Sequence, residues 1–290
     1  MKNLNRQHNA YEIKDPLLLS SPLIFASPHS GRQYNTSFIE EIALDKHEVR
    51  SSEDAYVDKL IDFVPSLGAP LLLAKVPRAV VDFNRATSEL DPELIKGINA
   101  RDLNSRTKAG LGVIPRVVSK GRRIYSDKIS LKEAQSRIRE YWNPYHEAIK
   151  RLLNRAEEAF GFSLLLDIHS MPHEAVAHLN KCHKNAEIVL GDRHGSSANL
   201  VFVELIESVF VSHGFSVSRN VPFAGAYITQ KYGQPNEGKN AIQIEIDRSL
   251  YIKEDILKFS DNYLEIKLRL CNALKEIICA IRDTTSLAAE

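Results

Sequence analysis

The sequence predicts an α/β protein with a mixed, largely parallel sheet that helices cover on both faces. Two observations support this fold class: several short runs of apolar residues, and longer amphipathic segments that alternate with them along the chain. Short runs without polar alternation are typical of strands whose two faces are both buried under helices. We expect strands at residues 23–26, 71–76, 80–83, 164–168 and 241–246.

The longest expected helix begins near Ser130, which forms a capping-box pattern with Glu133. Apolar residues then recur at helical spacing from Ile138 to Leu152. Pro144 lies inside this segment, and we expect it to kink or divide the helix because proline cannot donate a backbone hydrogen bond. Further helices are expected at residues 54–64, 197–213 and 253–282.

The stretch from about residue 91 to residue 126 lacks such patterns and is rich in arginine, lysine and asparagine. A loop of this length in a compact enzyme usually has a function, such as covering or binding a ligand. We therefore expect a single α/β hydrolase domain over residues 1–290, with a lid or binding loop at about 91–126.

Composition and charge favour a small-molecule partner. The chain has 290 residues, of which 43% are hydrophobic, and it can therefore bury a sizeable core. Its 38 Lys and Arg residues nearly balance 37 Asp and Glu residues. The resulting formal net charge of +1 gives no reason to expect a nucleic acid or a membrane surface as partner. The oligomeric state is left open.

The chain is expected in the cytoplasm. Its first 15 residues are polar and lack the apolar run of a secretory signal. No stretch reaches the roughly 18 uninterrupted apolar residues of a membrane-spanning helix. The three cysteines, Cys182, Cys271 and Cys279, are too few and too scattered for a disulfide framework or a thiolate zinc site.

Two histidines follow apolar runs, at the position where open α/β sheets bind their ligands. His29 comes after the run at 23–26, and His169 comes directly after the run at 164–168. Together they are a candidate pair of metal ligands, although either one alone is more often a structural residue. Side chains alternate along a strand, so Asp167 points to the same side as His169 and is a candidate partner for its second ring nitrogen.

An acidic third ligand is expected, because zinc hydrolases typically have three protein ligands and one open position. Glu53 and Asp54 are both candidates, and both could instead cap the helix expected to begin there. The run at 240–248 alternates without a break and places Gln243, Glu245 and Asp247 on one face. Glu245 is a candidate general base, unless this face is an ordinary solvent-exposed surface.

Two arginines, Arg78 and Arg85, flank a short apolar run. A guanidinium group matches the geometry of a carboxylate, so each is a candidate for binding an acidic substrate. Asn84 beside them is a candidate donor to a carbonyl oxygen or an oxyanion. Either arginine could instead pair internally with Asp82 or Glu89.

With these residues in order, the chain resembles the N-formylglutamate amidohydrolase family, which is related to zinc carboxypeptidases and aspartoacylase-type deacylases. The resemblance extends from about residue 27 to residue 251 and rests on short motifs in a fixed order. The motifs are Ser27-Pro28-His29-Ser30-Gly31-Arg32, Ser52-Glu53-Asp54, the segment from Pro77 to Arg85, Asp167-Ile168-His169-Ser170, Gly191-Asp192-Arg193-His194-Gly195 and Gln243-Ile244-Glu245.

The resemblance implies a zinc-carboxypeptidase-like fold and an activity. The activity is hydrolysis of N-formyl-L-glutamate, or a similar acidic N-acyl amino acid, to formate and glutamate, a step in histidine breakdown. One Zn²⁺ per chain is expected on His29, Asp54 and His169. The wider superfamily uses a His-x-x-Glu motif, but Arg32 stands where that glutamate would be. The resemblance therefore favours Asp54 over Glu53 as the acidic ligand.

The resemblance also implies roles for other polar residues. Glu245 matches a general base on a late strand, and the pair Asn84-Arg85 matches one that grips a substrate carboxylate. The expected substrate-binding residues are Arg85, Arg32, Arg193 and His194, and the expected oxyanion donors are Arg78 and Asn84.

Two alternatives stay open. The first is a zinc deacylase or carboxypeptidase-like hydrolase that acts on another N-acyl amino acid or on a peptide, which a substrate panel would distinguish. The second is a non-catalytic, metal-free ligand-binding protein on the same scaffold, which metal analysis would distinguish.

Overall fold

The computed structural model describes residues 5–99, 103–177 and 186–287. At its centre lies an eight-stranded sheet with the strand order β1-β2-β4-β3-β5-β8-β6-β7. The strands are β1 (Asn5–Gln7), β2 (Tyr11–Lys14), β3 (Leu23–Ser27), β4 (Leu71–Ala74), β5 (Ser163–Met171), β6 (Ile188–Gly191), β7 (Val217–Arg219) and β8 (Lys239–Asp247). Two further strands, β9 (Ile252–Lys253) and β10 (Lys258–Phe259), pair with each other.

Four adjacent strands, β4, β3, β5 and β8, run parallel to one another. On either side of this block the direction reverses, because β2 is antiparallel to β4 and β6 is antiparallel to β8. The predicted α/β class with a mixed, largely parallel sheet is confirmed. The carboxyl ends of the four parallel strands meet at one edge of the sheet, where a ligand site is expected.

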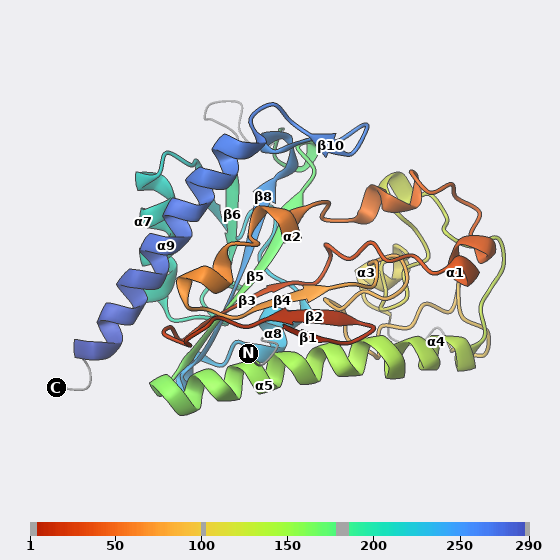
Figure 1. Cartoon of the computed structure of the whole chain (residues 1–290). Helices are drawn as coiled ribbons and strands as arrows, with labels where there is room; N and C mark the ends of the chain where they lie inside the picture. The colour runs from red at the N-terminus through yellow and green to blue at the C-terminus, as the bar shows by residue number, and fades with distance from the viewer. Residues whose placement is uncertain (1–4, 100–102, 178–185, 288–290) are drawn as a thin grey trace.

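Helices cover both faces of the sheet: α7 and α9 lie on one face, and α5 runs along the other (Figure 1). The α-helices are α1 (Thr36–Glu41), α2 (Val57–Leu60), α3 (Ser105–Lys108), α4 (Leu131–Arg137), α5 (Asn143–Phe160), α6 (Glu174–Ala177), α7 (Leu200–Ser212), α8 (Tyr227–Tyr232) and α9 (Tyr263–Leu287). Short 3-10 turns are η1 (Val49–Ser52), η2 (Val64–Leu67), η3 (Ser119–Gly121), η5 (Pro235–Glu237) and η6 (Arg248–Leu250). Within the described ranges, no helix is both long and apolar enough to cross a lipid bilayer.

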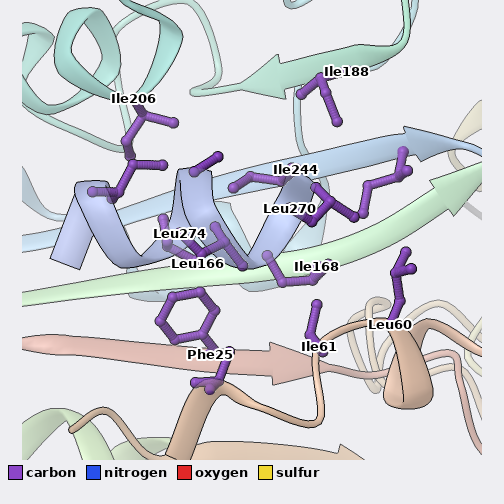
Figure 2. Packing of buried hydrophobic residues seen from close by; sticks show 14 of the residues in the cluster. Phe25, Leu60, Ile61, Leu166, Ile168, Ile188, Ile206, Ile244, Leu270 and Leu274 are labelled. Carbon is purple, nitrogen blue, oxygen red and sulfur yellow. The ribbon is translucent and has the colours of Figure 1, made fainter. Parts of the chain in front are cut away.

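Alternation along the strands divides the apolar core into two layers. Leu166 and Ile168 of β5 belong to the layer under α7 and α9, and Figure 2 shows them near Leu270 and Leu274 of α9. Leu165, the residue directly before Leu166, belongs to the layer under α5. Toward the carboxyl end of β5, the side chains on the α5 side of the strand change from apolar to ionisable. The functional site therefore begins where the apolar layer under α5 ends.

The helix predicted from Ser130 is continuous through Pro144, so Pro144 does not divide it, and the irregularity in this region is a π-helical turn. The side chain of Ser130 accepts a hydrogen bond from the backbone of Glu133, as the capping pattern predicts. A π-helical turn, η4 (Ile138–Trp142), joins α4 to α5. Pro144 follows this turn directly, and the wider turn accommodates the backbone bond that proline cannot make.

The prediction of a strand at 80–83 is also wrong. These residues are buried, but they form a turn and an irregular segment after β4. Val80 bonds back to the carbonyl of Pro77, and Asp82 bonds to the carbonyl of Val113 in place of a sheet neighbour. A buried apolar run of four residues is therefore compatible with a loop when another loop satisfies its backbone groups.

The helix expected at 253–282 begins later than predicted, because residues 252–259 contain the β9–β10 pair and α9 begins at Tyr263. The helix expected at 54–64 is reduced to α2 followed by η2, whereas α7 agrees closely with its predicted range. The predicted strands do not include β1, β2, β6 and β7, which are short and form the two outermost pairs of the sheet.

Leu270→Ala should lower the free energy of unfolding by about 2–5 kcal/mol, because it leaves a cavity between α9 and the sheet. Leu270 is 1% exposed, whereas Leu268 on the same helix is 63% exposed. Leu268→Ala is therefore the matched control and should change stability by less than about 0.5 kcal/mol. Urea unfolding measures both variants, and equal losses would contradict the packing described here.

Candidate metal centre and active site

The register of β5 and β8 places two candidate residues side by side. His169 and Glu245 are direct partners in this parallel pair, and Asp167 is the partner of Gln243. These four side chains lie on the same face of the sheet, opposite the isoleucines of β8. The predicted alternation is thus confirmed, and the face it describes is buried.

His29 follows the carboxyl end of β3, and its loop is fixed from two sides. A Cβ on Gly31 would overlap the carbonyl oxygen of Val76, so glycine is required where the loop passes the chain after β4. The backbone N–H of Asp54 donates to the carbonyl oxygen of His29 at 3.0 Å. This bond joins the segment before α2 to the loop after β3.

His29, Asp54 and His169 form a buried cluster that could hold a metal ion. One ligand atom from each residue lies within 4.8 Å of the others. Oδ2 of Asp54 is 2.9 Å from Nδ1 of His169 and 3.4 Å from Nδ1 of His29. The carboxylate therefore lies between the two rings. The rings contact each other edge to face, with their centroids 4.7 Å apart.

Each ring also contacts a further carboxylate through its Nε2 atom, and the two carboxylates are different. Nε2 of His29 is 2.8 Å from Oδ1 of Asp82, and Nε2 of His169 is 2.9 Å from Oδ2 of Asp167. A proton on each Nε2 satisfies these contacts and leaves the Nδ1 lone pairs directed at the cluster. Asp167 thus takes the position that its alternation with His169 predicts.

One buried atom of the cluster has no hydrogen-bond partner among the described residues. Nδ1 of His29 is enclosed, yet it forms no hydrogen bond. A buried nitrogen without a partner is costly, and a bound cation would satisfy it together with Nδ1 of His169 and Oδ2 of Asp54. Two imidazole nitrogens and one carboxylate oxygen fit the donor set of a catalytic zinc site.

Arg248 holds the second oxygen of Asp54. Its Nη2 donates to Oδ1 at 2.8 Å, and the same guanidinium binds the hydroxyl and the carbonyl oxygen of Ser170. Burial alone would raise the pKa of Asp54, but its contacts with the two histidines hold that pKa well below its usual range. Asp54 therefore stays ionised, with one oxygen directed at the cluster.

Glu53, the alternative ligand, lies outside the cluster. Its carboxylate accepts hydrogen bonds from the hydroxyl of Tyr34 at 2.8 Å and from the guanidinium of Arg50 at 3.1 Å. The geometry therefore assigns Asp54 to the cluster and leaves Glu53 as a structural partner of Arg50.

Glu245 is buried beside the cluster and is 7% exposed. Burial raises its pKa to about 7, while His169 and Arg248 lower it and Asp54 raises it further. Gln243 donates to its Oε1 at 2.7 Å. A carboxyl group that titrates near neutral pH can both accept and return a proton.

A cavity of about 640 Å³ opens next to the cluster. The cluster residues, Glu245, Arg78, Asn84, Arg85 and Arg248 all line it. Arg78 binds Asp82 through Nε at 2.9 Å, which confirms the internal pairing that its sequence allows. Both ends of the Asn84 amide contact protein groups, because Oδ1 accepts from Ile228 and Nδ2 lies near Gln243.

Three predicted substrate-binding residues are not among those that line the cavity. Arg32 forms a two-pronged ion pair with Asp58, with both distances at 2.8 Å. Arg193 is half-buried and His194 is exposed, both at positive φ in the turn after β6. The structure therefore brings Arg85 to the cavity and does not bring these three residues there.

Part of the expected loop at 91–126 forms a wall of the cavity. The segment 103–121 contributes Arg106, Leu111 and η3, among other residues, to its lining. Two anchors hold this segment: Arg116 binds Asp91 at 2.7 Å, and the carbonyl of Leu111 accepts from Nε of Arg85 at 3.0 Å. The segment thus lies where a binding loop would lie. That it moves as a lid stays a prediction.

Comparisons with known proteins agree with this geometry. A model of the N-formylglutamate amidohydrolase family matches residues 21–252. The chain belongs to this family. Two N-formylglutamate deformylases are 30% identical to it: the Pseudomonas putida protein over 238 residues, 80% of this chain and 82% of that one, and the Pseudomonas aeruginosa protein over 236 residues, 80% and 83%.

Solved structures agree with the family assignment. The crystal structure of N-formylglutamate amidohydrolase from Ralstonia eutropha JMP134 superposes with a TM-score of 0.87 at 31% identity, covering 97% of this chain and 99% of that one. Gene product Atu2144 from Agrobacterium tumefaciens has a TM-score of 0.66 at 14% identity, with 96% of both chains covered, and shares the fold. As a family member, the chain is an enzyme that hydrolyses an amide bond.

Two residues of the amidohydrolase site had no assigned role in the sequence. Arg248 ends the alternating run of β8, one residue beyond the last strand position, and only the fold brings it to Asp54. Arg106 lies in a segment without periodicity, and its place in the cavity depends on how that segment folds back. A positive charge directly after a strand with buried carboxylates is the signal that could have identified Arg248.

In this amidohydrolase, Asp54→Asn should lower the affinity for added Zn²⁺ by at least about 100-fold, because it removes the charged ligand between the histidines. Glu53→Gln is the matched control, since it removes the neighbouring buried carboxylate that lies outside the cluster. It should retain the affinity. Titration of the metal-free protein with Zn²⁺ measures both, and the reverse order would assign Glu53 as the ligand.

Proposed function

We propose that this amidohydrolase cleaves N-formyl-L-glutamate to formate and L-glutamate and that Zn²⁺ is its metal. One observation carries the proposal: a buried carboxyl group, Glu245, lies directly beside the His29, Asp54 and His169 cluster at the head of a cavity. Metal-assisted amide hydrolysis needs a metal ligand set, a base and space for the amide in this arrangement. The names of the relatives at 30% identity support the substrate.

Zn²⁺ is the metal that the donor set favours. The ligands would be Nδ1 of His29, Nδ1 of His169 and Oδ2 of Asp54. When bound, the ion supplies Lewis acidity, which lowers the pKa of a water molecule and polarises the amide carbonyl. Asp82 and Asp167 fix the two rings in the tautomer that this ligation needs.

Glu245 carries the proton. As the carboxylate, it accepts a proton from the water that attacks the formyl carbon. It then returns this proton to the amide nitrogen, so that the C–N bond breaks and the amine leaves neutral. The hydrogen bond from Gln243 to Oε1 keeps the carboxyl group oriented through both transfers.

Two arginines bind the negative charges of the reaction, namely the oxyanion and a carboxylate of the substrate. The Nη groups of Arg78 form no hydrogen bond to the described residues, and they are available to stabilise the oxyanion as the water adds. Arg85 lies deeper in the cavity wall and is our candidate for one carboxylate of the substrate. Asn84 positions the surrounding segments through its contacts with Ile228 and Gln243.

The size of the cavity favours one second candidate. At about 640 Å³ it falls within the range that holds drug-sized ligands, which leaves room for an acyl group larger than formyl. N-acyl amino acids with such acyl groups are therefore the alternative substrates. A panel that varies only the acyl group of glutamate separates the two.

Formate release from N-formyl-L-glutamate, measured with metal content, tests the proposal. We expect about one Zn²⁺ per chain, and activity that a chelator removes and added Zn²⁺ restores.

Glu245→Gln should lower kcat by about 10²–10⁴-fold and retain the metal, because it removes the base and leaves the ligands. Undiminished turnover in this variant would refute the role of Glu245, and a protein that never binds metal would favour the ligand-binding alternative.

The activity should also depend on pH with a defined sign. Because burial raises the pKa of Glu245 to about 7, the base is mostly protonated below that pH and mostly ionised above it. We therefore expect kcat/KM to rise with pH on the acidic side of neutrality. A profile from pH 5 to 8 measures this, and the residual rate of Glu245→Gln should lack the same rise.

A further inference from the structure

Arg85 is a buried cation without an anionic partner at hydrogen-bond distance in the described part of the chain. It is 6% exposed, and its bonds go to two carbonyl oxygens: Nε to Leu111 at 3.0 Å and Nη1 to Asn84 at 2.7 Å. Neutral carbonyl groups do not offset the charge of a guanidinium group. An anion entering the cavity would do so.

Arg106 of α3 is a second cation without an ion-pair partner in the described part of the chain, although it is exposed and not buried. Its side chain lines the same cavity. The other arginines of the site each have a carboxylate partner: Arg78 pairs with Asp82 through Nε, and Arg248 pairs with Asp54. Arg32, a predicted substrate-binding residue, is already paired with Asp58.

Hydrogen bonds to Glu89 connect the chain segments that carry these two arginines. One oxygen of Glu89 accepts from the backbone N–H of Ala86, directly after Arg85, at 2.9 Å. The other oxygen accepts from Nδ2 of Asn104 at 2.8 Å, and Asn104 caps the first turn of α3. The separation of Arg85 and Arg106 is therefore set by a bonded connection and not by a loose loop.

Electrostatics supports the same conclusion. Burial lowers the pKa of Arg85, the charges of Asp82 and Glu89 raise it, and the charges of Arg78 and Arg106 lower it. Like charges that face one cavity repel each other, and a doubly charged anion between them would relieve the repulsion.

We propose that Arg85 and Arg106 bind the two carboxylates of a dicarboxylic N-acyl amino acid, and that Arg106 selects for the acidic side chain. Arg85, which is buried and follows Asn84, a residue in contact with His169, binds the α-carboxylate, because that group is closer to the amide being cleaved. Arg106, on the exposed rim, binds the side-chain carboxylate. This inference rests on the proposed function, because it assigns a specificity to the same cavity.

The test compares N-formyl-L-glutamate with N-formyl-L-glutamine, which has the same shape and lacks the side-chain charge. Arg106→Ala should lower kcat/KM for the glutamate substrate at least about 10-fold more than for the glutamine substrate, mostly through KM. Arg106→Lys should recover part of the preference, because it restores the charge without the fork. Lys108→Ala removes an exposed charge from the same helix, outside the cavity lining, and should change neither substrate.

Lys120 is the competing cation, because it is exposed and lines the same cavity. Its φ of 60° favours asparagine as the replacement. The inference is overturned if Lys120→Asn, and not Arg106→Ala, removes the preference for the acidic side chain. It is equally overturned if Arg106→Ala reduces both substrates by the same factor.

Calorimetry with L-glutamate and L-glutamine separates this inference from the proposed function. If the protein releases no formate, the proposed function fails, and binding alone decides the role of Arg106. Tighter binding of L-glutamate than of L-glutamine, lost in Arg106→Ala, supports the subsite. Equal binding of the two, or a preference that survives in Arg106→Ala, refutes it.

Discussion

The hydrogen bonds from Asp82 and Asp167 to the two histidines are the constraint on which the site depends. Each takes Nε2 of its ring and so commits Nδ1 of His29 and His169 to the space beside Asp54. A ring turned the other way would offer a proton where a lone pair is needed. The two carboxylates come from different segments, one after β4 and one within β5, so the whole arrangement requires the folded sheet.

The fold class was predictable from the sequence because the central strands are apolar on both faces. Runs such as 164–168 are long enough to identify, and they correspond to observed strands. The edge strands are short and gave no such signal. The run at 80–83 shows the limit of prediction from local sequence, since its backbone is satisfied by a hydrogen bond from Asp82 to Val113, which lies in a separate loop.

The sequence also located His29, His169 and Glu245, because each belongs to a strand or directly follows one, and strand alternation determines the direction of its side chain. The residues themselves left both Glu53 and Asp54 open, and only the family resemblance favoured Asp54. Adjacent residues in an irregular segment point in directions that local sequence does not determine. The arginines were the least predictable, since their long side chains reach partners, such as Asp58 for Arg32, that only the fold brings near.

The pairing of β5 with β8 has an evolutionary consequence. The spacing between His169 and Glu245 is set by backbone hydrogen bonds between neighbouring strands, about 4.8 Å apart in any sheet. One wall of the cavity, in contrast, comes from one continuous stretch of chain, 103–121. Insertions or exchanges in that stretch can change which acids are admitted while the hydrolytic centre stays in place. New substrate preferences can therefore arise in this fold without rebuilding its chemistry.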